Sequence, residues 1–284
     1  MKASVSVISL VLTLLIASPL AAQDIPRLPN GLPNMNGIWQ VMNEAHWDLE
    51  THIARHSVQM REGPVNPVAA ASTLHAGAVL SVPGSMGVIV GGGQIPYTPE
   101  ARARKEDNMA NWIDRDPEIK CYMPGVPRAT YMPMPFQVVQ SENDFFIAYT
   151  FAGAVRDIYL DNPGPSPVDS WMGWSLGQWE GDTLVVEVTG ISDQTWLDRS
   201  GSHHSYQMKV TERYTMMSPN HIDYEATIED PLMLTEPFTI KMPIYRRMEE
   251  NARIMDLSMR SGWWAVGSGR RSRRKFRNCR RSRL

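Results

Sequence analysis

Cysteine is scarce in this chain, with Cys121 and Cys279 the only two among 284 residues. Neither has metal-ligand spacing, so the cysteines indicate no metal site. One lies in the body of the chain and the other in an unusual C-terminal segment, and we therefore expect no native disulfide between them.

Signatures of nucleotide and metal binding are absent as well. The sequence has no P-loop, no G-x-G-x-x-G between a strand and a helix, and no H-E-x-x-H. The glycine-rich run at 90–96 ends in Pro96, which predicts a flexible loop rather than a phosphate cradle at a helix start. We expect no cofactor and no metal.

Long apolar runs are limited to the N-terminus. Lys2, a largely apolar and uncharged run from Val5 to Ile16, a break at Pro19, and the small residues Ala21 and Ala22 together predict a signal peptide over residues 1–22. An uncleaved anchor is the alternative, although the run is short for a membrane span. No later segment is apolar for long enough to cross a membrane. We therefore expect a periplasmic or secreted protein without a membrane span.

The C-terminal segment 257–284 lacks acidic residues in its last fifteen positions, which hold nine Lys or Arg. Without these nine and Lys2, 18 basic residues face 30 acidic ones, a formal charge of −12 for the rest of the chain. The Arg, Gly, Ser and Trp bias is typical of GC-rich coding sequence read out of frame. A basic arm and an ordinary disordered terminus are the alternatives. We expect no nucleic-acid partner, and the sequence leaves the oligomeric state open.

The body of the chain, 23–256, reads as a single β domain. From Phe136 onward, eight short alternating runs are separated by turn residues, and Gly37-Ile38-Trp39 opens one further strand. A meander of this length must close or expose two edges, so we predict a mainly β fold, an antiparallel up-and-down barrel.

One hairpin allows its register to be predicted. If Arg213 faces Glu225 across the turn at 218–220, then Lys209 faces Glu229. Two opposite-charge pairs on one face favour this register.

The insertion at about 43–135 is irregular and partly helical. Thr98 as N-cap and Pro99 at the first helical position predict a helix to about Trp112. The segment 44–60 is compatible with a short amphipathic helix, and four prolines within 121–137 indicate an extended connection.

Two sets of histidines are candidates, one for metal binding and one for acid-base catalysis. His52 and His56, spaced i, i+4 with His46 nearby, would share a helix face as a divalent metal site, but no third ligand has defined spacing, which favours a solvated helix or loop. The polar loop 192–207 predicts a barrel-mouth site that offers Asp198, His203 and His204. The alternative is a loop whose His and Asp only cap turns.

Four blocks of sequence carry a family resemblance. The segments 116–140, 169–190, 193–214 and 224–231 resemble those of an uncharacterised family of secreted bacterial proteins, and Gly37-Ile38-Trp39 resembles the G-x-W start of lipocalins. The resemblance implies a lipocalin-like barrel and matches His204 to a family histidine, but it implies no reaction. Family members continue past the last strand differently, so this chain departs from the family there.

Three classes of function follow. The first is a barrel that binds an apolar or aromatic small molecule; the second is a lyase, isomerase or hydrolase acting on such a molecule; the third is an interaction module that uses residues 43–97. For catalysis we expect His204 as general acid or base, with Asp198 orienting it. The expected ligand-binding residues are Trp171, Trp174, Trp179, Trp196, Arg156, Arg213 and Tyr149. The alternative for the first three tryptophans is a place in the core.

Overall fold

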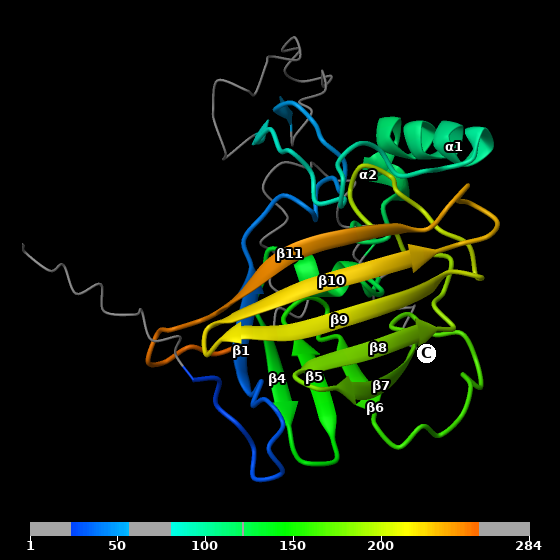
Figure 1. Cartoon of the computed structure of the whole chain (residues 1–284). Helices are drawn as coiled ribbons and strands as arrows, with labels where there is room; N and C mark the ends of the chain where they lie inside the picture. Colours follow the sequence, from blue (N-terminus) through cyan, green and yellow to red (C-terminus); the bar gives the residue numbers. More distant parts are fainter. Residues whose placement is uncertain (1–23, 57–80, 121, 256–284) are drawn as a thin grey trace, which may run out of the picture.

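A computed structural model describes residues 24–56, 81–120 and 122–255. Nine strands form one closed barrel (Figure 1). The strands are β1 (Gly37–Val41), β4 (Phe136–Gln140), β5 (Phe145–Tyr149), β6 (Val155–Tyr159), β7 (Trp174–Glu180), β8 (Thr183–Thr189), β9 (Lys209–Ser218), β10 (His221–Glu229) and β11 (Phe238–Arg246). All nine predicted strands are present, and the barrel fits the predicted lipocalin-like fold.

The barrel is mixed rather than wholly antiparallel, which corrects the prediction of a pure up-and-down meander. Strands β6 and β7 pair in parallel, with Ile158 opposite Ser175. The connection 160–173, which carries the predicted turn at 162–165, is long enough to return the chain to the end of the barrel where β6 began. Every other neighbouring pair is antiparallel.

Strand β1 closes the barrel between β4 and β11. Trp39 lies opposite Phe136 on one side and Arg246 on the other. Its ring is fully buried, its Nε1 donates to the Met35 carbonyl at 2.8 Å, and the Arg246 guanidinium lies 4.2 Å from the ring centroid. The G-x-W tryptophan therefore anchors the closure of the sheet.

The predicted register of the β9–β10 hairpin is confirmed. Arg213 faces Glu225 and Lys209 faces Glu229. The ion pairs form with other neighbours, however, because Arg213 reaches Glu180 at 3.0 Å. Charge matching thus indicated the right alignment, while Arg213 pairs with Glu180 of β7 and Lys209 with Glu187 of β8.

The barrel interior is filled by alternate side chains of the strands. The inward residues of the last three strands are all buried: Val210, Glu212, Tyr214 and Met216 of β9; Ile222, Tyr224, Ala226 and Ile228 of β10; and Phe238, Ile240, Met242 and Ile244 of β11. Polar groups among them occur as a hydrogen-bonded cluster around Glu212.

The insertion between β1 and β4 lies largely at one end of the barrel (Figure 1). It contains β2 (Arg55–His56), β3 (Ser81–Val82), α1 (Pro99–Ala110), α2 (Trp112–Arg115) and the 3₁₀ helix η2 (Arg128–Tyr131). Helix α1 begins as predicted, and the Thr98 hydroxyl accepts from the Ala101 amide at 3.3 Å.

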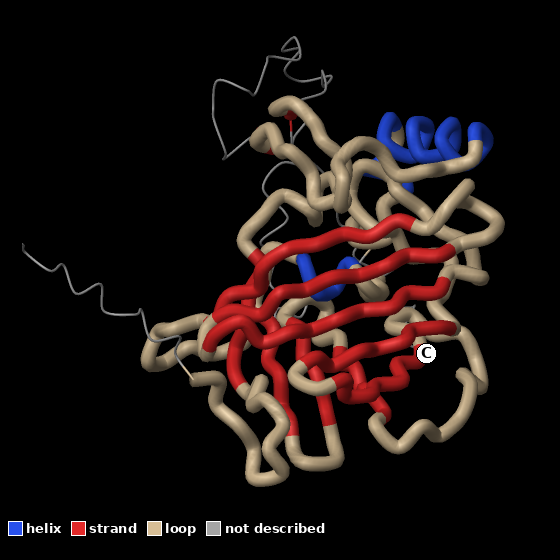
Figure 2. Tube along the Cα trace, viewed as in Figure 1, coloured by secondary structure: helices blue, strands red, loops and turns tan. Residues whose placement is uncertain are grey.

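Two local predictions in the insertion are wrong. Residues 44–54 form turns and loops rather than a helix. The proline-rich segment is not extended throughout. Residues 128–131, which lie between Pro127 and Pro133, form η2, and the Thr130 amide donates to the Pro127 carbonyl at 3.0 Å. Figure 2 shows this short helix beside the strands at the centre of the view.

No helix of the described residues is long and apolar enough to cross a membrane. The predicted signal peptide 1–22, the segment 257–284, Cys121 and Cys279 all lie outside the described residues.

Candidate functional site

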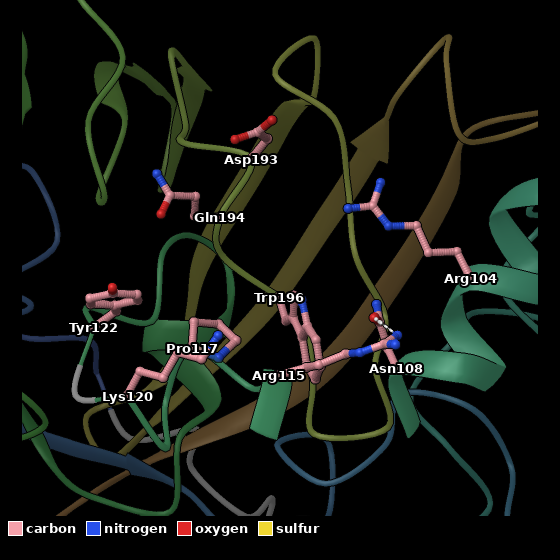
Figure 3. Close-up of a pocket in the computed structure, with 9 residues that line it drawn as sticks. All are labelled: Arg104, Asn108, Arg115, Pro117, Lys120, Tyr122, Asp193, Gln194 and Trp196. Atoms are coloured by element: carbon pink, nitrogen blue, oxygen red, sulfur yellow. Dashed lines mark hydrogen bonds between the residues drawn. The ribbon is translucent and has the colours of Figure 1, made fainter. Parts of the chain in front are cut away.

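A cleft of about 360 Å³ opens beside α1, at the end of the barrel that carries the insertion. Its walls come from α1, α2, the loop that follows them and the connection between β8 and β9 (Figure 3). The lining residues are Arg104, Asn108, Arg115, Pro117, Lys120, Tyr122, Asp193, Gln194 and Trp196.

Helix α1 is fixed against the β8–β9 connection by a close backbone approach. Gly201 has a φ of +91°, and a Cβ there would lie 2.7 Å from the Asn108 Cβ and from the Lys105 carbonyl oxygen. The Asn108 side-chain amide donates to the Gly201 carbonyl at 3.2 Å. The two walls of the cleft therefore have a set spacing, because a side chain at 201 would push them apart.

Aromatic rings form part of the cleft wall. Trp196 is only 7% exposed and its backbone pairs with that of His203. Tyr122 packs its ring 4.7 Å from Trp171, which lies just behind the lining. Of the four predicted tryptophans, Trp196 thus lines the cleft and Trp171 supports it.

The charged lining residues are mainly basic. Arg104 is exposed on α1, and Figure 3 shows its guanidinium extending toward the middle of the cleft. Arg115 is held by the Asp107 carboxylate and lies 3.4 Å from the Asn108 side-chain oxygen. Asp193 is exposed on the opposite wall.

Next to the lining residue Pro117 in the sequence, the buried carboxylate of Glu118 contacts three cationic or potentially cationic side chains. Glu118 accepts from Arg128 at 2.7 Å and from Arg199 at 2.8 Å, and His46 lies 3.2 Å away. Burial raises the pKa of Glu118, but His46 and Arg199 outweigh it and hold that pKa well below its usual range. This network ties the loop after α2 to the β8–β9 connection.

His203 is buried beside the cleft. Its ring stacks on Tyr97 with centroids 5.5 Å apart, and neither ring nitrogen has a partner of hydrogen-bond geometry among the described residues. Burial, and next the charge of Arg104, lower its pKa to about 4, although the nearby backbone of Gly201 acts in the opposite direction. The imidazole is therefore neutral near pH 7.

The predicted catalytic pair is not formed, which corrects the expectation for His204 and Asp198. His204 is buried, with Nε2 2.6 Å from the Thr195 hydroxyl and Nδ1 2.9 Å from the Ser205 carbonyl. Asp198 is fully buried and accepts instead from the amides and hydroxyls of Ser200 and Ser202, and from the amide of Leu49 in the insertion. Short serine-rich loops satisfy a carboxylate locally, so Asp198 closes the loop rather than orienting a histidine.

The other predicted ligand-binding residues lie elsewhere. Trp174 stacks on Tyr159 at 4.4 Å and bonds the Gly164 carbonyl, while Trp179 packs against the core. The remaining three are Arg156 and Tyr149, both buried inside the barrel, and Arg213, exposed on its wall.

One pentapeptide in this chain matches a hydrolase signature. Residues 173–177 read G-x-S-x-G, but Ser175 is buried near the start of β7 and accepts from Arg156 Nε at 2.8 Å. A nucleophile elbow needs a strand-to-helix turn that exposes the serine, so this pentapeptide is structural.

The alternative of a divalent metal site at His46, His52 and His56 finds no support in the described residues. His52 lies in a loop, where its ring nitrogens contact the Glu50 and Pro83 carbonyls. In the part of the chain that the structure describes, no group of three His, Cys, Asp or Glu side chains could hold a metal ion.

Sequence reasoning missed most of the cleft. Arg104, Asn108, Arg115, Lys120, Tyr122 and Gln194 carried no signal beyond that of an ordinary helix face or loop. Only Trp196 was predicted as a ligand-binding residue, and Asp193 belonged to the predicted barrel-mouth loop.

Comparison of this chain with models of protein families, with curated protein sequences and with solved structures gave no match.

Proposed function

We propose that this protein is a periplasmic or secreted barrel that binds a small aromatic molecule, and that the ligand occupies the cleft beside α1 rather than the barrel interior. The observation that carries the proposal is the placement of Trp196 and Tyr122 on the walls of a cleft of about 360 Å³. This volume lies at the lower end of the range of small-molecule sites, roughly 300 to 1,000 Å³, which favours a ligand of one or two rings.

The barrel centre is a poorer candidate. Tyr224 and Glu212 are fully inaccessible there, and Arg156 is 3% exposed. A ligand would have to displace hydrogen-bonded side chains, leaving buried polar groups unpaired at about 1–3 kcal/mol each.

Binding is favoured over catalysis by the position of the histidines. His203 and His204 are the imidazoles closest in sequence to Trp196, and both are at most 3% exposed. A general acid or base must come within hydrogen-bond reach of the substrate, and buried rings meet this condition poorly.

The binding proposal is tested by titrating the protein with naphthalene-2-carboxamide and related one- and two-ring compounds, using tryptophan fluorescence and calorimetry. Replacing Tyr122→Ala should weaken binding at least about fivefold, because the variant loses one aromatic contact of about 1 kcal/mol. Tyr245→Leu, at the opposite end of the barrel, is the matched control and should bind as the wild type does. Absence of binding by every aromatic compound, or equal loss in both variants, contradicts the proposal.

The location is tested separately. Cell fractionation with intact-mass measurement should find the protein outside the cytoplasm and shortened by the N-terminal 22 residues. Recovery of the unprocessed chain in the cytoplasm contradicts that part of the proposal.

A further inference from the structure

The cleft has a charge opposite to that of the body around it. Arg104, Arg115 and Lys120 line it together with a single acid, Asp193. The chain without its basic ends carries a formal charge of −12. A positive cleft on an acidic body concentrates field lines and favours anionic molecules over neutral ones of the same shape.

The three basic residues are not equivalent. Arg115 is already compensated by Asp107. Arg104 is exposed, and no ion pair joins it to an acid within the described residues. Its guanidinium extends toward the middle of the cleft from the α1 side, and Tyr122 lies across from it in Figure 3.

This arrangement matches a ligand with a ring at one end and an acid at the other. A guanidinium offers a planar pair of donors that fits a carboxylate in bidentate fashion. The ring would lie against Tyr122 and Trp196 while the acid meets Arg104. The arrangement therefore recognises both halves of one small molecule.

We propose that the ligand of the cleft is an aromatic carboxylate, bound through its acid group by Arg104. The inference rests on the proposed function, since it names the chemical class of the ligand for the same cleft. Lys120, at the Tyr122 end of the lining, adds positive charge without setting the orientation.

The test compares probes with one ring system and different charge. Naphthalene-2-carboxylate and naphthalene-2-carboxamide are titrated into the full protein at about 0.05 M and about 0.5 M salt. The carboxylate should bind about tenfold more tightly than the carboxamide at low salt, the size expected for one charge-assisted hydrogen bond. The difference should shrink at high salt because the site is open to solvent.

Two variants locate the effect. Arg104→Gln should remove the preference, so that the carboxylate and the carboxamide bind with similar affinity. Arg213→Gln, which removes an exposed arginine from the outer barrel wall, should change neither.

The outcomes separate the two proposals. Equal binding of carboxylate and carboxamide by the wild type overturns the inference but leaves the aromatic cleft standing. Equal loss of both probes in Arg104→Gln also overturns it, because the residue would then act through the structure of the cleft. Binding of neither probe overturns both proposals.

Discussion

Arg156 on β6 and Glu212 on β9 form an ion pair inside the barrel, although two strands separate them in the wall. Both side chains are at least 97% buried. The other Glu212 oxygen accepts from the hydroxyls of Tyr214 at 2.9 Å and Tyr224 at 2.7 Å. Burial raises the pKa of each tyrosine, and Glu212 raises it further, so both phenols stay protonated and act as donors.

Replacing Glu212→Gln should destabilise the fold by about 3–5 kcal/mol, because Arg156 would keep its charge in the core without a counter-ion. The amide oxygen can still accept from the tyrosines, so the loss reports mainly on the charge. Urea unfolding followed by circular dichroism measures it.

The matched control for this variant is Glu180→Gln, which breaks the exposed pair with Arg213. Surface pairs contribute about 0–1 kcal/mol, so this change should be small. Similar losses of unfolding free energy in the two variants would mean that removing the buried counter-ion of Arg156 costs no more than breaking an exposed ion pair.

Local patterns in the sequence were enough to predict the strands and one register. The alternation in 209–229 is a property of each strand and its nearest partner, and Arg213 opposite Glu225 follows from it. The parallel pairing of β6 and β7 was not predictable in this way. The turn residues at 162–165 are compatible with a tight hairpin, and only packing of the whole barrel selects the longer crossing.

The cleft was largely unpredictable because its walls come from distant segments. Arg104 and Tyr122 belong to the insertion, whereas Trp196 lies in the β8–β9 connection. From the sequence alone, an exposed arginine on a helix looks like any other solvent-facing charge. Its role in a cleft becomes visible only when the structure shows the wall opposite it. The predicted pair of His204 and Asp198 was wrong for a different reason. Sequence spacing shows that two side chains can come within contact distance, but it does not show how buried they are or which hydrogen-bond partner each ring nitrogen has.

Gly177 is expected to be intolerant of any side chain. A Cβ at this position would lie 2.5 Å from Ile158 Cγ2 and 3.0 Å from Leu160 Cδ2, a consequence of the parallel β6–β7 pairing. Gly177→Ala should therefore cost about 1–3 kcal/mol by overpacking. Gly181 faces open space with a φ of +61°, and Gly181→Asn should cost well under 1 kcal/mol, since asparagine tolerates this conformation. Thermal unfolding of both variants checks the contrast, and an equally stable Gly177→Ala protein would contradict the packing account.

His203 and His204 are neighbours with opposite expected responses to the same substitution. Neither ring nitrogen of His203 is hydrogen-bonded among the described residues, whereas His204 contacts Thr195 and Ser205. His203→Phe should leave the free energy of unfolding unchanged or raise it, because an apolar ring removes buried unsatisfied groups. His204→Phe should lose about 1–3 kcal/mol, because the Thr195 hydroxyl and the Ser205 carbonyl lose a partner. Comparable losses in both variants would show that His203 has a partner that its geometry does not reveal.

His203 should also contribute to acid sensitivity. Burial, followed by the charge of Arg104, lowers its folded-state pKa to about 4, below the ordinary value of 6.5. Between these values the unfolded chain binds a proton that the folded protein does not, so the free energy of unfolding falls as pH decreases from about 6.5 to about 4. Lowered pKa values of His46 and His204, also caused first by burial, act in the same direction.

The share of His203 is isolated by comparing His203→Phe with the wild type in urea unfolding at several pH values. The variant lacks the proton uptake of His203, so its stability relative to the wild type should increase steadily as pH falls through this window. Above about pH 7 the difference should be constant, because the imidazole is neutral in both folded and unfolded states. The stability that is lost at low pH through Glu118 and the other histidines is the same in both proteins, so it cancels in the difference. A difference that stays flat from pH 7 to pH 4 would mean that the His203 pKa is the same in the folded and unfolded chains, and that the ring is open to water in solution.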